Sequence, residues 1–352
     1  MGLKLFIPQS HRVECLIAAS LVLLCVLLVT APSQASPQAT PTLVPAAYLP
    51  FISKGRAAVT PPPPGNWLAY VNYYRAMADL PPVTENTAYS NGDWLHARYM
   101  VKTDTVEHAE NPGNPWYTPE GHAAAQASNL AASYSASVSD EWAIDAWMQA
   151  PFHAVGVLDP SLLQVGYGSY READGGLQSG AALDVIRGLT YTVPSGIVFP
   201  IKWPADGMIV PLRLHWGESP SPLTSCPGYT APSGLPIILE IGPGNLTPSV
   251  TGHSFIQGGA PLEHCVFDET SYSHPDPGSQ SLGRSILNSR DAIVLIPRLP
   301  LTPRASYTAS ITVDGQTHTW TFSVSSTATS VGIQGIIEAG VTEDGPDTIV
   351  DQ

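Results

Sequence analysis

The chain has 352 residues, of which only 12% are charged, and a formal net charge of −14. This charge argues against nucleic-acid binding, because neutralising phosphates needs clustered Lys and Arg, and the sequence contains no basic run. An acidic surface suits an extracellular protein, a cationic partner or divalent cations. The length is sufficient for about two domains.

The N-terminus has the pattern of an export signal. Lys4 and Arg12 precede an apolar run of about 14 residues at 16–29, which fits a signal-peptide core better than a membrane span of about 20 residues. We therefore predict a signal peptide over residues 1–35 and a secreted or cell-surface protein with no membrane span in the mature chain. Retention of the leader as a membrane anchor is the alternative.

Two further segments lack the composition of a folded core. Residues 36–65 are rich in Pro and Thr and predict an extended linker. Residues 326–352 carry several acidic side chains and no Lys or Arg, which predicts a disordered acidic tail.

Residues 66–188 alternate helical and strand patterns. Trp67, Val71 and Tyr74 recur on one face of a helix that should end before Pro81. Ser139 is the expected N-cap of a later helix. The complete set of expected elements is helices over 66–80, 88–102, 123–130 and from 140, and a hairpin of strands 163–170 and 177–187. This order indicates an α+β domain.

Residues 189–325 contain serial short strands, expected at 197–201, 209–214, 236–241, 292–296, 306–313 and 317–324. Val313-Asp314-Gly315-Gln316 is a hairpin turn signal between two of them. Leu301-Thr302-Pro303 with Tyr307 resembles the tyrosine corner of immunoglobulin-like and fibronectin type III sandwiches. We therefore predict an all-β immunoglobulin-like sandwich over 189–325.

Two cysteines remain once the leader is set aside. Cys226 and Cys265 form an even pair in a chain predicted to be exported, which indicates a disulfide. Closing a loop of about 40 residues would stabilise the fold by roughly 4 kcal/mol in the chain-entropy model.

No strong catalytic motif is present, so the candidates are histidines and carboxylates of the first predicted domain, which holds four of the ten histidines of the chain. If the segments around His108 and His153 meet, their imidazoles and nearby carboxylates would line one cleft. Such a set suits a divalent ion such as zinc, or general acid–base work. The alternative is that these histidines cap loops or helix ends by hydrogen bonding. The cleft candidates are His108, Glu110, Glu120, Ser128, Asp145 and His153.

A family resemblance rests on four short sequence motifs, which occur in this order: LPPV at 80–83, WMQAPFH at 147–153, LDP at 158–160 and VGYG at 165–168. Together they resemble the bacterial branch of the CAP superfamily, which comprises cysteine-rich secretory, antigen 5 and pathogenesis-related proteins. The resemblance covers roughly residues 66–188. It implies an α-β-α sandwich.

The resemblance also implies a cleft of two histidines and two acidic residues, with which metal ions have been associated. His108 and His153 match the two histidine positions. Ser128 stands where the GENL-like word of the family carries its acid, so Glu110 or Glu120 is the candidate replacement. Asp145 is the candidate for the second acid. Ala150-Pro151-Phe152 also departs from the usual Ser-Pro-Gly.

Family functions are lipid or sterol binding, wall or partner interaction, and disputed proteolysis. The main hypothesis is therefore an exported protein that binds a lipid, small ligand, wall component or protein partner. The first alternative is a metal-assisted hydrolase with His108 and His153 as zinc ligands and Glu120 or Asp145 as base. The second is a structural surface module. The only cofactor that the sequence suggests is a divalent metal ion such as zinc.

Overall fold

The computed structural model describes residues 59–190, 192–329 and 335–338, so the predicted signal peptide and most of the predicted linker lie outside the described residues. All described residues fall in one compact unit that begins at Ser53. We call residues 66–188 the N-terminal half and residues 201–324 the C-terminal half.

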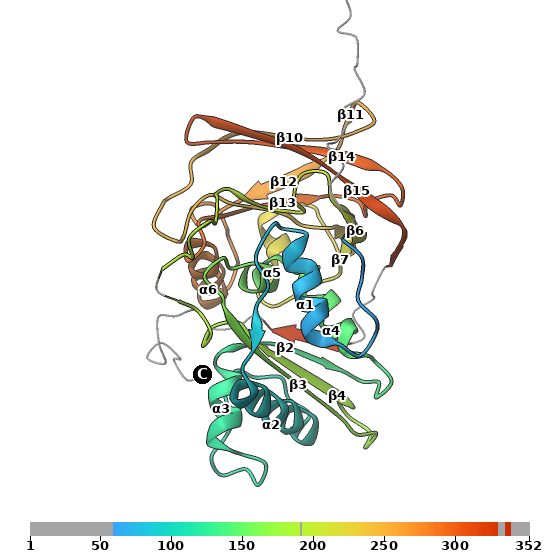
Figure 1. Ribbon diagram of the computed structural model, residues 1–352, viewed down its shortest axis with the longest axis vertical. Coiled ribbons are helices and arrows are strands. Elements are labelled where there is room, and N and C mark those ends of the chain that lie inside the picture. The colour runs from blue at the N-terminus through green and yellow to red at the C-terminus, as the bar shows by residue number, and fades with distance from the viewer. Residues whose placement is uncertain (1–58, 191, 330–334, 339–352) are drawn as a thin grey trace, which may run out of the picture. The chain divides into compact units, whose positions relative to one another are not determined.

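The N-terminal half is an α-β-α sandwich (Figure 1). Helices α2 and α3 cover one face of its sheet, and α1, α4 and α5 lie over the other. The sheet has the order β1-β3-β4-β2-β16, in which β16 is the late segment Gly335–Glu338. The elements are α1 (Trp67–Ala76), β1 (Thr84–Glu85), α2 (Thr87–Thr103), α3 (Pro119–Ala125), β2 (Ser128–Ser133), α4 (Asp140–Met148), α5 (Pro151–Val157), β3 (Gln164–Arg171) and β4 (Ser179–Asp184).

Local signals explain most of these elements. Asn66 caps α1 by accepting from the backbone of Ala69, and Ser139 caps α4 as predicted. The predicted helix over 123–130 is wrong beyond Ala125. The following small residues form β2, which pairs with β4 and is buried along its whole length. Its sheet hydrogen bonds and burial between helices override the helical propensity of alanine.

The C-terminal half contains two main sheets, with strand orders β11-β10-β14-β15-β6 and β12-β13-β9-β5, and a small β7-β8 pair. Its elements are β5 (Ile201–Trp203), β6 (Ile209–Leu212), β7 (Leu214–His215), the 3₁₀ helix η1 (Pro222–Ser225), β8 (Ser233–Gly234), β9 (Ile237–Glu240), β10 (Val250–Gln257), β11 (Ala260–Pro261), β12 (His264–Phe267), α6 (Pro277–Asn288), β13 (Ala292–Pro297), β14 (Ser306–Val313) and β15 (Gln316–Thr329).

Parts of the sandwich expectation are met in this half. The β14–β15 hairpin forms at the predicted turn. The backbone N–H of Thr302 donates to the Tyr307 hydroxyl over 2.6 Å, which is the hydrogen bond of a tyrosine corner. However, β6 pairs parallel with β15, and helix α6 was not expected. The immunoglobulin-like assignment stays a prediction.

The expected disordered tail is wrong at its beginning. Strand β15 continues to Thr329, and β16 (Gly335–Glu338) pairs antiparallel with β2. The chain thus returns from the C-terminal half to the sheet of the N-terminal half, where β16 covers the edge that β2 would otherwise expose. Residues 339–352 lie outside the described residues.

A single hydrophobic cluster runs through both halves. The Tyr74 and Trp203 rings lie 5.6 Å apart, and the Ala205 N–H donates to the Met77 carbonyl across the contact surface between the halves, which we call the seam.

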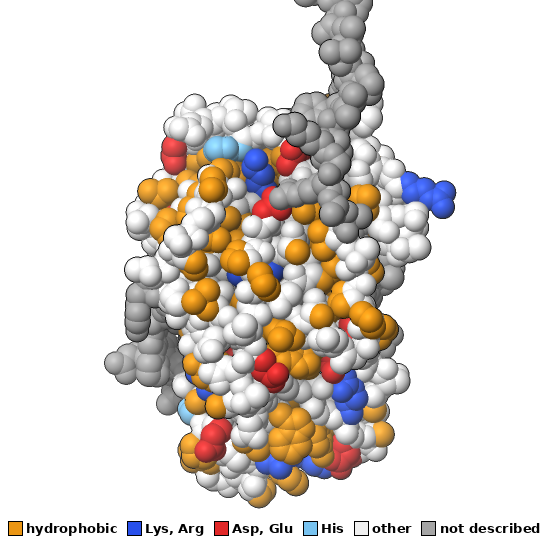
Figure 2. Space-filling model, viewed as in Figure 1, with side chains coloured by type: hydrophobic (Ala, Val, Ile, Leu, Met, Phe, Trp, Pro, Cys, Tyr) orange, Lys and Arg blue, Asp and Glu red, His pale blue; other side chains and the backbone are white. Residues whose placement is uncertain are grey.

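On the face shown in Figure 2, charged side chains are scattered among uncharged ones. None of the helices among the described residues is long and apolar enough to cross a membrane. The domain boundaries proposed from the sequence stay a prediction.

The predicted disulfide joins Cys226 and Cys265, with 5.6 Å between their Cα atoms. Replacing both cysteines by alanine should lower the free energy of unfolding by about 2–4 kcal/mol, because the unfolded chain regains loop entropy. Urea unfolding of both proteins measures this loss. Wild type in reducing agent should match the double variant; equal stability of all three samples would contradict the prediction.

Candidate functional site

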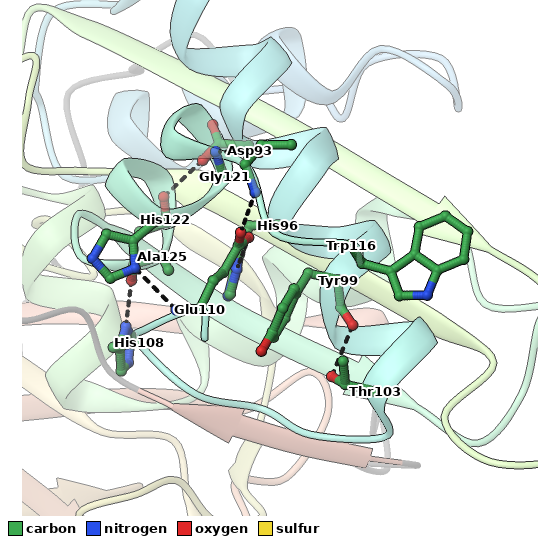
Figure 3. Close-up of polar contacts among 12 residues, drawn as sticks. Asp93, His96, Tyr99, Thr103, His108, Glu110, Trp116, Gly121, His122 and Ala125 are labelled. Atoms are coloured by element: carbon green, nitrogen blue, oxygen red, sulfur yellow. Dashed lines mark hydrogen bonds and ion pairs between the residues drawn. The ribbon is translucent and has the colours of Figure 1, made fainter. Parts of the chain in front are cut away.

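Glu110 organises a polar network between α2 and α3 (Figure 3). Its buried carboxylate lies 3.0 Å from the Nδ1 atom of His96 and accepts the backbone N–H of Thr118. The Glu110 N–H in turn donates to Nδ1 of His122 over 3.0 Å. A Cβ on Gly121 would stand 2.5 Å from the carboxylate, so this position needs glycine. The network fixes the loop between α2 and α3, which contains Pro112 and Pro115, onto both helices.

His108 and Glu120 lie next to this network, but neither connects the two helices as Glu110 does. The Nδ1 atom of His108 lies 2.7 Å from the carbonyl of Ala125 and therefore carries the proton. Glu120 is exposed in the first turn of α3. Of the two candidate replacements for the missing family acid, Glu110 is therefore the buried, hydrogen-bonded one.

Ser128, for which the resemblance predicts the position of a family acid, forms a hydrogen bond with the carboxyl group of another residue. Its hydroxyl donates to Asp93 over 2.7 Å, and both residues are buried. Burial, and then the nearby Asp184 carboxylate, raises the pKa of Asp93 well above its usual value. A carboxyl group thus lies beside Ser128 after all, supplied by α2.

Asp145 lies on the other side of the sheet with two tyrosines of α1. The hydroxyls of Tyr70 and Tyr74 donate to the same carboxylate oxygen over 2.7 and 2.5 Å. Burial raises the pKa of Asp145 to about 6, although both hydroxyl bonds oppose this shift. These contacts tie α4 to α1.

His153 lies within helix α5. Its Nδ1 atom is 2.7 Å from the carboxylate of Glu218, which follows β7 in the C-terminal half. The same carboxylate accepts the N–H of Phe152, while His215 bonds to the carbonyl of Gln149. The imidazole of His153 and the carboxylate of Glu218 are both fully buried at the seam.

The predicted site residues thus fall into separate groups. His108 lies in the chain between α2 and α3, which cover one face of the sheet, whereas α5 with His153 lies over the other face. Within the described ranges, no group of three or more His, Cys, Asp and Glu could hold a metal ion. A zinc ion shared by His108 and His153 stays a prediction.

Sequence reasoning missed Glu218 as the partner of His153. The two residues are 65 positions apart and belong to different halves, so chain order gives no sign of their contact. The only available signal was the carboxylate itself, a charged residue between His215 and Pro220 in a region poor in charges.

A cavity of about 520 Å³ lies along the seam, between the N-terminal half and α6. Arg290 and Asp159 meet at its wall with 3.1 Å between Nε and Oδ2. Asn129 also lines it and donates to the carbonyl of His153, which connects the cavity to the His153 pair. The apolar part of the lining includes Phe152, Val185, Ile186, Leu189, Val193 and Ile286, and the neutral polar part includes Asn129, Ser161, Thr190, Thr192, Asn245 and Ser289.

Buried charges continue behind this wall. Arg75 donates to the backbone carbonyls of Val157 and Asp159, and burial lowers the pKa of its guanidinium to about 10. Burial raises the pKa of Glu240 well above its usual value, and its carboxylate oxygens have no hydrogen-bond partner in the part of the chain that the structure describes. Arg75 and Glu240 therefore lie close enough across the seam for each to influence the pKa of the other.

Comparison with known proteins finds one family match, which lies within the N-terminal half. Residues 68–183 match the model of the CAP family, described as the cysteine-rich secretory protein family. The match covers about a third of the chain and shows a CAP-family domain there. No curated protein matches the chain, and no solved structure matches it either. The bacterial branch of the family stays a prediction.

The Glu218 carboxyl should make stability depend on pH. Burial raises its pKa from the usual 4.5 to about 8. Because the folded-state pKa is the higher one, the stabilisation from the protonated group is full below pH 4.5 and is lost as pH rises through 8. The unfolding free energy of wild type minus that of Glu218→Gln should therefore fall across this range in urea titrations.

Glu263→Gln is the matched control, since Glu263 is an exposed carboxylate paired with Arg298. The unfolding free energy of wild type minus that of Glu263→Gln should not fall in this way as pH rises. A wild-type minus Glu218→Gln difference that stays constant or rises with pH would contradict the assignment.

Proposed function

We propose that this chain is an exported CAP-domain protein that binds a small, neutral, amphipathic molecule in the cavity at the seam. The observation that carries the proposal is the cavity of about 520 Å³ itself. Its volume falls within the roughly 300–1,000 Å³ of typical small-molecule sites. This narrows the predicted ligand classes to a small lipid-like or other amphipathic compound.

The lining supports a neutral ligand. Apolar side chains such as Leu189 and Ile286 would contact a hydrocarbon portion, and Asn129 and Asn245 offer amides to hydroxyl or carbonyl groups. The charged groups at the wall, Arg290 and Asp159, are already paired with each other. A ligand carboxylate would have to compete with Asp159 and enter a protein with a net charge of −14.

Two observations support export. The N-terminal sequence has the pattern of a signal peptide, the chain forms a disulfide, and disulfides persist in oxidising compartments. The hydrolase alternative has no specific observation in its favour, because the His153 imidazole and its Glu218 partner are both buried. The structural-module alternative leaves the cavity without a role.

A titration with the neutral dye Nile red tests the binding proposal. Wild type should show saturable fluorescence enhancement, because the dye would leave water for the partly apolar cavity. Thr192→Trp should weaken binding at least roughly tenfold, or about 1.4 kcal/mol, because the indole would fill the cavity from its lining. Decan-1-ol should displace the dye at lower concentrations than decanoate.

Thr319→Trp provides the matched control, since Thr319 is exposed on β15 and does not line the cavity. It should bind the dye as wild type does. Equal affinity of the Thr192→Trp and Thr319→Trp proteins, or no saturable binding by wild type, would overturn the proposal.

A further inference from the structure

Two histidines meet at the surface of the C-terminal half, away from the cavity. His253 of β10 is exposed and His264 of β12 is half-buried. The Nδ1 atom of His253 lies 2.9 Å from the Nε2 atom of His264, and the ring planes are 81° apart. The two strands belong to different sheets, so the histidine pair connects the two main sheets of this half. The ring of Phe255 lies next to His264, with 6.3 Å between the ring centroids.

The hydrogen bonds define the tautomer of His264. Its Nδ1 atom is 2.7 Å from the carbonyl of Leu262, which can only accept, so Nδ1 carries the proton. In the neutral ring the Nε2 atom then has a free electron pair, and His253 Nδ1 donates to it. A backbone carbonyl that holds the far nitrogen of a metal-binding histidine is a common supporting contact in metal sites.

The state of His253 also suits metal binding. His253 is the donor of the pair, so its proton lies on Nδ1 and its Nε2 atom carries an electron pair. If its proton moves from Nδ1 to Nε2, both facing nitrogens present electron pairs with no net proton release. Metal ions bind imidazole in this neutral form.

The hydrogen-bonded separation of the two nitrogens can be compared with the ligand spacings of two coordination geometries. With metal–nitrogen bonds of about 2.0–2.1 Å, neighbouring ligands of a square-planar ion stand about 2.9 Å apart. Tetrahedral zinc would require about 3.4 Å. The hydrogen-bonded distance of 2.9 Å equals the square-planar spacing, and Cu²⁺ binding would require each ring to turn by about 45° to aim its electron pair at the ion.

We propose that His253 and His264 form a two-histidine site for Cu²⁺ at the edge of the sandwich. Two coordination positions would remain for water or for donors of another molecule. The supporting backbone is held in place, since β10 pairs with β14, β12 pairs with β13, and the neighbouring Cys265 forms the disulfide. Copper is also the divalent ion of its series that nitrogen ligands bind most strongly. The site is independent of the proposed small-molecule cavity.

Titration of the full chain with Cu²⁺ in a glycine-buffered solution tests this site. Wild type should bind one equivalent that His253→Ala and His264→Ala each lose or bind at least tenfold more weakly. The electron paramagnetic resonance spectrum of the wild-type complex should show coupling to imidazole nitrogens, and this coupling should be reduced in both variants. Zn²⁺ should bind more weakly than Cu²⁺.

His318→Ala is the matched control, because His318 lies on β15 in the same half and outside the pair. It should bind copper as wild type does, and circular dichroism should show that all three variants are folded. Copper affinity that is unchanged in both pair variants would overturn the proposal. So would a wild type that binds no copper above the glycine buffer, or one that binds Zn²⁺ more tightly.

Discussion

The burial of helix α5 is the constraint on which the rest of the structure depends. All seven of its residues are buried, and residues of both halves contact the helix. Phe152 packs 5.1 Å from Tyr272 of the C-terminal half, and His153 forms its hydrogen bond with Glu218. A buried imidazole without a partner would be costly. The C-terminal half therefore completes the CAP-family domain instead of only extending it.

This arrangement changes which residues can form a site. The acid bonded to His153 comes from the C-terminal half, and the cavity wall joins Asp159 with Arg290 across the seam. In a CAP domain by itself, the cavity would lose one wall and the His153 ring would lose its carboxylate. The proposed ligand site is therefore a property of the two halves together.

The sequence predicted what depends on local patterns. Apolar spacing and capping side chains located α1 and α4, and a four-residue turn located the β14–β15 hairpin. It could not predict β10, whose residues VTGHSFIQ lack a clean apolar alternation. The sequence could not predict contacts between distant segments for a different reason. Many histidine–carboxylate pairs are possible in a chain of this composition, and only the packed fold shows that His153 pairs with Glu218.

The central claim is that the halves share one core and unfold together. Hydrogen-exchange mass spectrometry across a urea series tests it most directly, by comparing peptides from residues 67–157 with peptides from residues 201–324. We predict a single common unfolding midpoint, because loss of either half would expose α5 and separate the buried pairs. Two distinct midpoints, with peptides of one half still protected after the other has unfolded, would contradict the account.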